Sequence, residues 1–317
     1  MKARRFLPGS SVGGVLVGLV LVALIFGALV GPQFFRAANL ELMARQTVIV
    51  AVAALGMTMI IVSGGIDLSV GSIVSLSTVV VALLLKKHGP ALAAFGAVAA
   101  GAACGAVNGL LITQLRVVPF IVTLGTMLLV RGAAKGLADE RRIEAPITWL
   151  NDLLRTARDG RGWLLPSGIW ITVALAIVVA LMLRYTRFGR HLFAIGSNER
   201  TARLCGVRIN HTKFAVYTLG GALAGLAGVM EFSKLSVGDP TVAVGLELDV
   251  IAAVIIGGGS LLGGKGSVLG TLAGAAIMVV IQVGCSQQGL PNWVQQIVTG
   301  TIIIGAVALD RWRQKST

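Results

Sequence analysis

The chain consists of long apolar segments that follow one another with short polar stretches between them. A helix needs ~20 mostly apolar residues to cross the hydrocarbon core of a membrane. Only 13% of the residues are charged, against about 25% in a typical soluble domain. The sequence therefore predicts an all-α integral membrane protein with about ten transmembrane helices. The expected segments lie at about 12–31, 46–63, 68–85, 91–112, 118–136, 166–184, 213–232, 248–257, 266–284 and 292–309.

The first segment follows Lys2, Arg4 and Arg5. It is longer than the apolar part of a cleaved signal peptide, which has about 7–15 residues, so we expect an uncleaved first transmembrane helix. Lys and Arg gather in the cytoplasmic loops of membrane proteins. The basic stretch 184–213 and the basic ends of the chain therefore predict that both termini are cytoplasmic, as an even number of crossings requires.

The chain shows no signal of enzymatic chemistry. The stretch 259–265, GSLLGGK, has the spacing of a P-loop, but Gly266 stands where Ser or Thr must hold Mg²⁺. We therefore expect any ATP to be handled by another subunit. His88, His191 and His211 have no partner at metal-ligand spacing, so no cofactor, metal or catalytic residue is predicted. The net charge of +14 comes from basic residues between apolar segments, which indicates membrane topology and argues against nucleic-acid binding.

Two halves of the chain, at about 12–136 and 166–309, share short motifs in a similar order. Glycine is abundant, so one match could arise by chance, but three ordered matches favour an internal duplication within a single transmembrane domain over 1–317. Repeated halves with glycine-interrupted segments are typical of transporters with a central path. The matched motifs are GGIDLSVGSIV (64–74) with GGGSLLGGKGSVL (257–269), IVTLGT (121–126) with IVTGT (297–301), and the evenly spaced Gly101, Gly105, Gly109 with Gly266, Gly270, Gly274.

The stretch SGGIDLSVGS at 63–72 separates two apolar segments with glycines and one acid. Asp67 either caps a helix that begins near Leu68 or contacts the transported substrate directly. The stretch 257–266 is expected to be a second break of this kind. Because few charged groups lie within the segments, the path suits an uncharged substrate. The candidates for path or hinge positions are Gly64, Gly65, Asp67, Ser69, Asn108, Phe120, Thr123, Gly257, Gly258 and Gly259.

The longest basic loop, at 185–213, contains a predicted short helix. Asn198 is a favourable N-cap, and an acid at Glu199 suits the first turn. The helix would end at Gly206. Its exposed arginines fit either a soluble partner or the anionic surface of a membrane, and the loop alone leaves both open.

Five stretches together make the chain resemble the permease subunit of bacterial monosaccharide ABC importers, in the branch for ribose, xylose and arabinose. They occur in the family's order and span most of the chain; the loop at 137–165 shows no family pattern. The stretches are PQFF (32–35), ALGMTMIIVSGGIDLSVGS (54–72), PFIVTLGTM (119–127), TRFGRHLFAIGSNERTARLCGVRIN (186–210) and ELDVIAAVIIGGGSLLGGKGSVLGT (247–271).

The resemblance implies a multi-pass protein of the bacterial cytoplasmic (inner) membrane that works by alternating access. Two permease subunits, as a homodimer or a paralogous heterodimer, would form the path. A tandem-cassette ATPase would dock on the cytoplasmic face, and a periplasmic binding protein would deliver the sugar. The resemblance favours a partner contact for the 185–213 loop, through Gly189, Gly196, Asn198, Glu199, Ala202, Arg203 and Gly206.

Ribose is the first substrate expected from the resemblance, followed by other pentoses and hexoses. One alternative is a permease of the same architecture for another solute, such as a furanone signal or a branched-chain amino acid. A second alternative is an ion-coupled secondary transporter that works alone. Asp67 is the only strong acidic candidate away from the segment ends, and a single acid gives little support to ion coupling.

Overall fold

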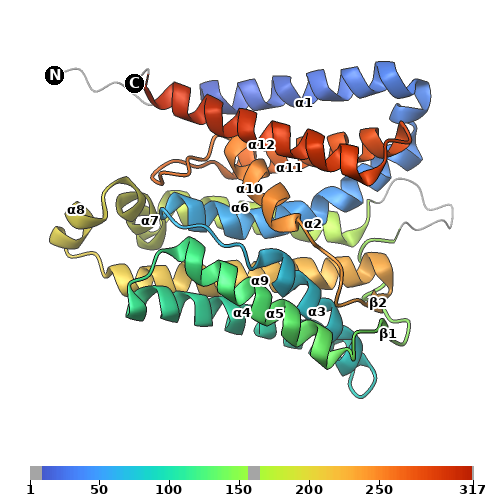
Figure 1. Ribbon diagram of the computed structural model, residues 1–317, viewed down its shortest axis with the longest axis horizontal. Helices are drawn as coiled ribbons and strands as arrows, with labels where there is room; N and C mark the ends of the chain where they lie inside the picture. The colour runs from blue at the N-terminus through green and yellow to red at the C-terminus, as the bar shows by residue number, and fades with distance from the viewer. Residues whose placement is uncertain (1–8, 156–164, 316–317) are drawn as a thin grey trace.

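The computed structural model describes residues 9–155 and 165–315 (Figure 1). In this part of the chain the structure is a bundle of helices with one pair of two-residue strands. The elements are α1 (Gly9–Val30), a 3₁₀ turn (Pro32–Phe35), α2 (Ala37–Val62), α3 (Val70–Leu85), α4 (Pro90–Leu115), α5 (Pro119–Leu137), β1 (Ile143–Glu144), α6 (Ser167–Tyr185), α7 (Arg187–Ser197), α8 (Glu199–Leu204), α9 (Ile209–Leu235), β2 (Val237–Gly238), α10 (Leu246–Ile256), α11 (Val268–Gln287) and α12 (Asn292–Lys315).

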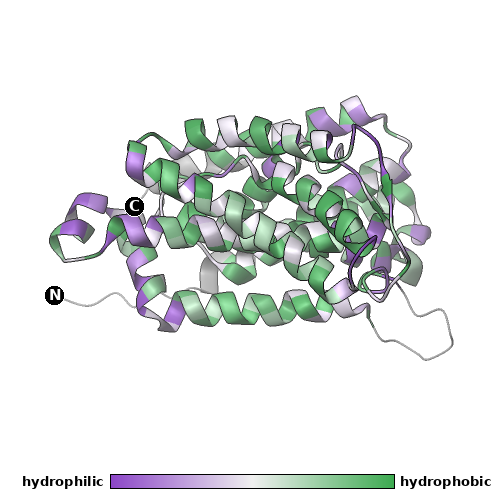
Figure 2. Ribbon diagram, turned by 90° about the horizontal axis from the view of Figure 1, so that it is seen from below, coloured by the Kyte–Doolittle hydropathy of each residue, from purple (hydrophilic) through white to green (hydrophobic). Residues whose placement is uncertain are grey.

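The ten predicted segments all fall on helices, with the largest difference in α2. This helix begins at Ala37, because polar residues such as Asn39 continue it beyond its apolar part. Seven of the described helices are long and apolar enough to cross a membrane: α1, α2, α4, α5, α6, α9 and α11. Figure 2 shows apolar residues along the helices and polar residues gathered at the two ends of the molecule, as a membrane-spanning protein requires.

The centre of the bundle is formed by α2 and α9, and α4 lies along α9 (Figure 1). Glycines at the predicted spacing of four make this contact possible. An added Cβ on Gly101 or Gly105 would overlap the α9 backbone at Gly221 or Tyr217. Helices approach this closely in lipid only where side chains are small, so the predicted role of the first glycine series is confirmed.

Two short helices, α3 and α10, begin inside the bundle and are each preceded by a non-helical segment (Figure 1). Residues 63–69 lead into α3, and residues 239–245 lead into α10. The amino ends of the two helices meet, since Gly71 lies against the carbonyl oxygen of Ala243 and a carboxylate oxygen of Glu247. Non-helical backbone of this kind is tolerated at membrane depth only when protein or water satisfies it.

The stretch 257–266 was predicted to be a second glycine-rich break, and its role as a hinge or part of the path stays a prediction. Those residues form the loop between α10 and α11, at the same end of the molecule as α7 (Figure 1). Gly257 ends α10 and packs against the backbone of Gly270, while Gly258 takes a positive φ of 90°. The glycines therefore terminate a helix and allow close packing, and residues 239–245 form a further non-helical stretch before α10.

Candidate functional site

The predicted short helix α8 stands at one end of the molecule, beyond α7 (Figure 1). The Asn198 side chain accepts a hydrogen bond from the Thr201 backbone N–H at 3.0 Å, which is N-cap geometry. After Cys205 the chain leaves the helix through Gly206, at a φ of 82° that favours glycine. The sequence prediction of an Asn198 cap and a Gly206 stop is confirmed.

Glu199 fixes α8 to the rest of the protein. Its carboxylate accepts hydrogen bonds from Lys213 on α9 at 2.7 Å and from Arg203 at 3.1 Å. Partial burial tends to raise the pKa of Glu199, but the bonds and charges of Lys213 and Arg203 outweigh it and lower the pKa. Ala202 is buried, whereas Leu204 is 89% exposed, so α8 presents an apolar side chain and arginines to the outside.

Gly196 of α7 connects this unit to the bundle. An added Cβ would overlap the carbonyl oxygen of Val62 and the backbone nitrogen of Gly264. The same two groups share a hydrogen bond of 2.9 Å. The end of α7 therefore lies directly on both the 63–69 segment and the α10–α11 loop, which are distant in sequence. Gly189 makes a similar close approach to the backbone of Leu183.

Four of the predicted path residues lie together inside the bundle and are fully buried. We call them the interior polar cluster: Asp67, Ser69, Asn108 and Thr123. Asp67 Oδ1 accepts hydrogen bonds from the backbone N–H and hydroxyl of Ser69, at 2.8 and 2.6 Å. Asn108 Nδ2 donates to Ser69 Oγ at 2.9 Å. Thr123 Oγ1 lies 3.4 Å from the carbonyl oxygen of Ile66.

The predicted capping role of Asp67 is wrong. Helix α3 begins at Val70, and its N-cap residue is Ser69, which makes no side-chain capping bond. Asp67 instead bonds the residue two positions ahead, so it stabilises the turn before the helix. Asp239 makes the matching pair of bonds to Thr241, at 2.8 and 2.6 Å, in the segment before α10.

The other path candidates are placed apart from this cluster or beside it. Gly64 has a φ of 80° and neighbours Gly196, while Gly65 packs against the Tyr217 hydroxyl. Phe120 is 46% exposed at the start of α5. The remaining candidates, Gly257, Gly258 and Gly259, lie in or next to the α10–α11 loop.

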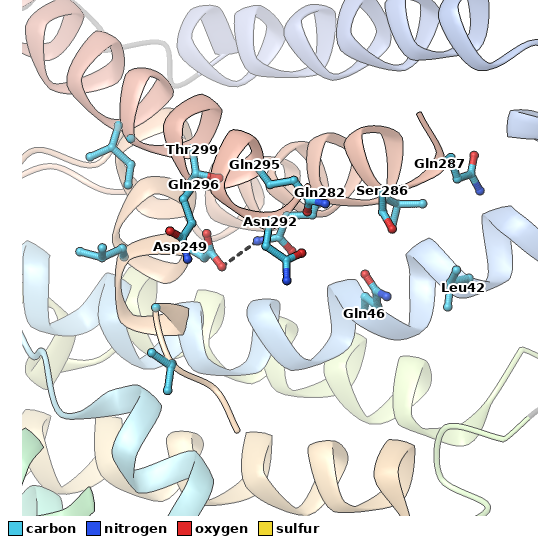
Figure 3. Close-up of a pocket in the computed structure, with 16 residues that line it drawn as sticks. Leu42, Gln46, Asp249, Gln282, Ser286, Gln287, Asn292, Gln295, Gln296 and Thr299 are labelled. Atoms are coloured by element: carbon cyan, nitrogen blue, oxygen red, sulfur yellow. Dashed lines mark hydrogen bonds between the residues drawn. The ribbon is translucent and has the colours of Figure 1, made fainter. Parts of the chain in front are cut away.

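A polar cavity of about 680 Å³ lies between α2, α10, α11 and α12. Figure 3 shows its amide and hydroxyl side chains converging from these helices, with Gln282 Nε2 donating to Asp249 Oδ2 at 2.7 Å. The sequence reasoning missed this site. Its signal was an amide face on the last segment, where polar residues recur at helical spacing: Asn292, Gln295, Gln296 and Thr299.

The bundle, its polar ends and its interior polar groups define a multi-pass helical membrane protein. Residues 39–307 match the family described as "Branched-chain amino acid transport system / permease component", and the chain belongs to this permease family. No solved structure matches the chain.

Named relatives align with nearly the whole chain. The ribose import permease protein RbsC of Escherichia coli K12 is 40% identical over 93% of this chain and 92% of its own length. RbsC of Bacillus subtilis 168 is 39% identical over 94% of this chain and 92% of its own length. The fructose import permease protein FrcC of Rhizobium meliloti is 34% identical over 99% of this chain and 89% of its own length.

Proposed function

We propose that this chain is the membrane-spanning subunit of an ATP-driven importer that carries a monosaccharide, with ribose as the first candidate, into the cytoplasm. The observation that supports this most strongly is its similarity to ribose import permeases along 93% of its length. Fructose and L-arabinose permeases also match at 34–36% identity. All of these relatives are named for the transport of a monosaccharide, which supports a monosaccharide as the substrate. In this proposal the chain does not hydrolyse ATP itself, and a partner subunit supplies the ATP hydrolysis.

The ATPase is proposed to dock on α7 and α8. Three features support this docking site: the capped helix α8 stands beyond the bundle, it exposes Leu204 and Arg203, and Gly196 joins its base to two loops of the bundle. A push on α8 would therefore reach both loops through backbone contacts. The end with α7 and α8, which also holds the end of α12, is proposed to be cytoplasmic (Figure 1).

The remaining partners are a second permease copy or a paralogue, and a periplasmic sugar-binding protein on the opposite face. We also infer an internal duplication that pairs α2–α5 with α9–α12. The matching turns of Asp67 and Asp239 support this pairing, because each precedes a short helix that starts inside the bundle. This pairing aligns 63–69 with 239–245, in place of 257–266.

Reconstitution in liposomes tests the proposal. The chain with its cognate ATPase and binding protein should accumulate radiolabelled ribose, or another pentose or hexose, only when ATP is supplied. Uptake by the chain alone under a proton gradient would instead support an ion-coupled secondary transporter. ATP-dependent uptake of a branched-chain amino acid without any sugar would support the solute named in the family description.

A further inference from the structure

We propose that the polar cavity between α2, α10, α11 and α12 binds the monosaccharide inside the permease during transit. This inference rests on the proposed function and gives it a location. It differs from a path through the interior polar cluster, whose side chains are fully buried. The cavity, in contrast, is an open space of about 680 Å³, within the range of about 300–1,000 Å³ that small-molecule sites occupy.

The lining has the chemistry of a site for hydroxyl groups. Each sugar hydroxyl donates one hydrogen bond and accepts others, so it needs both kinds of partner. Amide side chains supply both, and a carboxylate supplies strong acceptors. Asp249 and Gln282 form one wall of the cavity, and Gln46 faces them from α2. The α12 amides Gln295 and Gln296 line the remaining side (Figure 3).

Charge selects among possible solutes. Among its described lining residues the cavity has one acid, Asp249, and no basic side chain. An amino acid or a phosphorylated sugar would bring a carboxylate or phosphate with no cationic partner, which is costly away from water. A neutral polyol carries no such penalty, so the lining favours an unphosphorylated sugar.

A second space of about 300 Å³ lies beside the cavity and reaches α9, and Gln46, Asp249 and Gln282 line both spaces. Among the described residues of this second lining Lys234 is the one basic side chain, and it is paired with Glu231 at 3.0 Å. The Asp249–Gln282 pair therefore borders both spaces. Polar groups within membrane helices are costly unless they face a partner or a path, and this position gives them a path.

Transport by matched leucine variants provides the first test. Gln282→Leu removes an amide from the cavity, whereas Gln288→Leu makes the same change just after the end of α11 at an exposed residue outside the lining. In the full complex, Gln282→Leu should lower the maximal ribose uptake rate roughly tenfold, as expected for one lost hydrogen bond to a hydroxyl. Gln288→Leu should transport normally, and both variants should copurify with the ATPase.

Sugar protection of an introduced thiol tests binding directly. Gln46→Cys is made in a chain whose Cys104, Cys205 and Cys285 are replaced by alanine, with Ser286→Cys as its substitute if that complex does not transport. Saturating ribose, or whichever sugar the transport assay identifies, should slow labelling by a small thiol reagent at least threefold, whereas mannitol should not.

The outcomes separate this inference from the proposed function. If a complex that transports the sugar is labelled at the same rate with and without it, the cavity is not the binding site. The proposed function would still stand. Normal transport by Gln282→Leu would also overturn it. Failure of the wild-type complex to transport any sugar would overturn the proposed function itself.

Discussion

Gly196 fills a space that admits no side chain, because the Val62 carbonyl and the Gly264 nitrogen lie against its Cα. Gly196→Ala must push α7 away from both groups. We expect a destabilisation of about 1–3 kcal/mol, which is typical of overpacking. Gly132→Ala on α5 is the matched control, since nothing lies within 4 Å of its added Cβ. Thermal unfolding of the purified protein in detergent should show a lowered Tm for Gly196→Ala alone.

Asp67 holds the turn before α3 through Oδ1, so the effect of replacing it depends on that oxygen. Asp67→Asn keeps an acceptor there and should fold with a Tm close to that of the wild type. Asp67→Ala leaves the buried Ser69 N–H without its partner, at a cost of about 1–3 kcal/mol. Equal Tm values for the two variants would contradict this account of the turn.

The structural role of a residue could be predicted from the sequence where it depends on local interactions, but not where it depends on tertiary contacts. Asn198 caps a helix that starts at the next residue, so the sequence pattern alone located it. The partners of Asp67 include Asn108 on another helix, and no local pattern contains that information. Its carboxylate could also satisfy either a helix end or a turn, and the packing of α3 selected the turn.

At the scale of elements, α8 offers an exposed apolar side chain for docking. Leu204→Asn should reduce copurification of the ATPase several-fold, because a buried leucine side chain contributes about 1.5–3 kcal/mol to an apolar contact. Leu165→Asn makes the same change at a 47% exposed leucine just before α6, outside the α7–α8 unit. Membrane insertion should be normal for both, and retained ATPase binding by Leu204→Asn would refute the docking site.

The attachment of α8 to α9 should depend on pH through Glu199. Its pKa is lower in the folded protein than the ordinary value of 4.5, so ionisation stabilises the fold above that value and the benefit is lost as the pH falls through the folded pKa. Hydrogen-exchange protection factors of residues 199–206 should be constant from about pH 7 to about pH 5 and fall in more acidic solution. Glu199→Gln should show the weakened protection at every pH.

The apolar helices could be predicted from their length and composition, including the short α10, whereas α7 lies in a stretch that was predicted to be a loop. The non-helical stretch at 239–245 could not be predicted in this way. The glycines at 257–259 indicated a helix break there, because glycine often ends a helix. The stretch at 239–245 contains one proline and two residues with positive φ, Ala243 and Gly245. The stretch 239–245 resembles 63–69 in the side-chain hydrogen bonds of Asp239 and Asp67. The amino-acid sequence indicates such bonds only weakly.

At the scale of the whole molecule, the proposed orientation predicts which cysteine is reached from each side. Cys205 is exposed at the end of α8, whereas Cys285 is buried and Cys104 is half-buried. A membrane-impermeant maleimide should label Cys205 in inside-out vesicles and leave it unlabelled in intact cells. In a Cys205→Ala background, His88→Cys in the turn between α3 and α4 should show the opposite pattern. Labelling of Cys205 in intact cells would reverse the orientation.

The meeting of α3 and α10 by their amino ends has an electrical consequence. Each amino end carries roughly half a positive charge, and acids lie close to them: Asp67 before α3, and Glu247 and Asp249 in the first turn of α10. The positive amino ends of the two helices therefore favour the negative charge of these carboxylates. Passage of a neutral sugar through such an interior displaces no net charge, so the voltage across the membrane would neither drive nor oppose import.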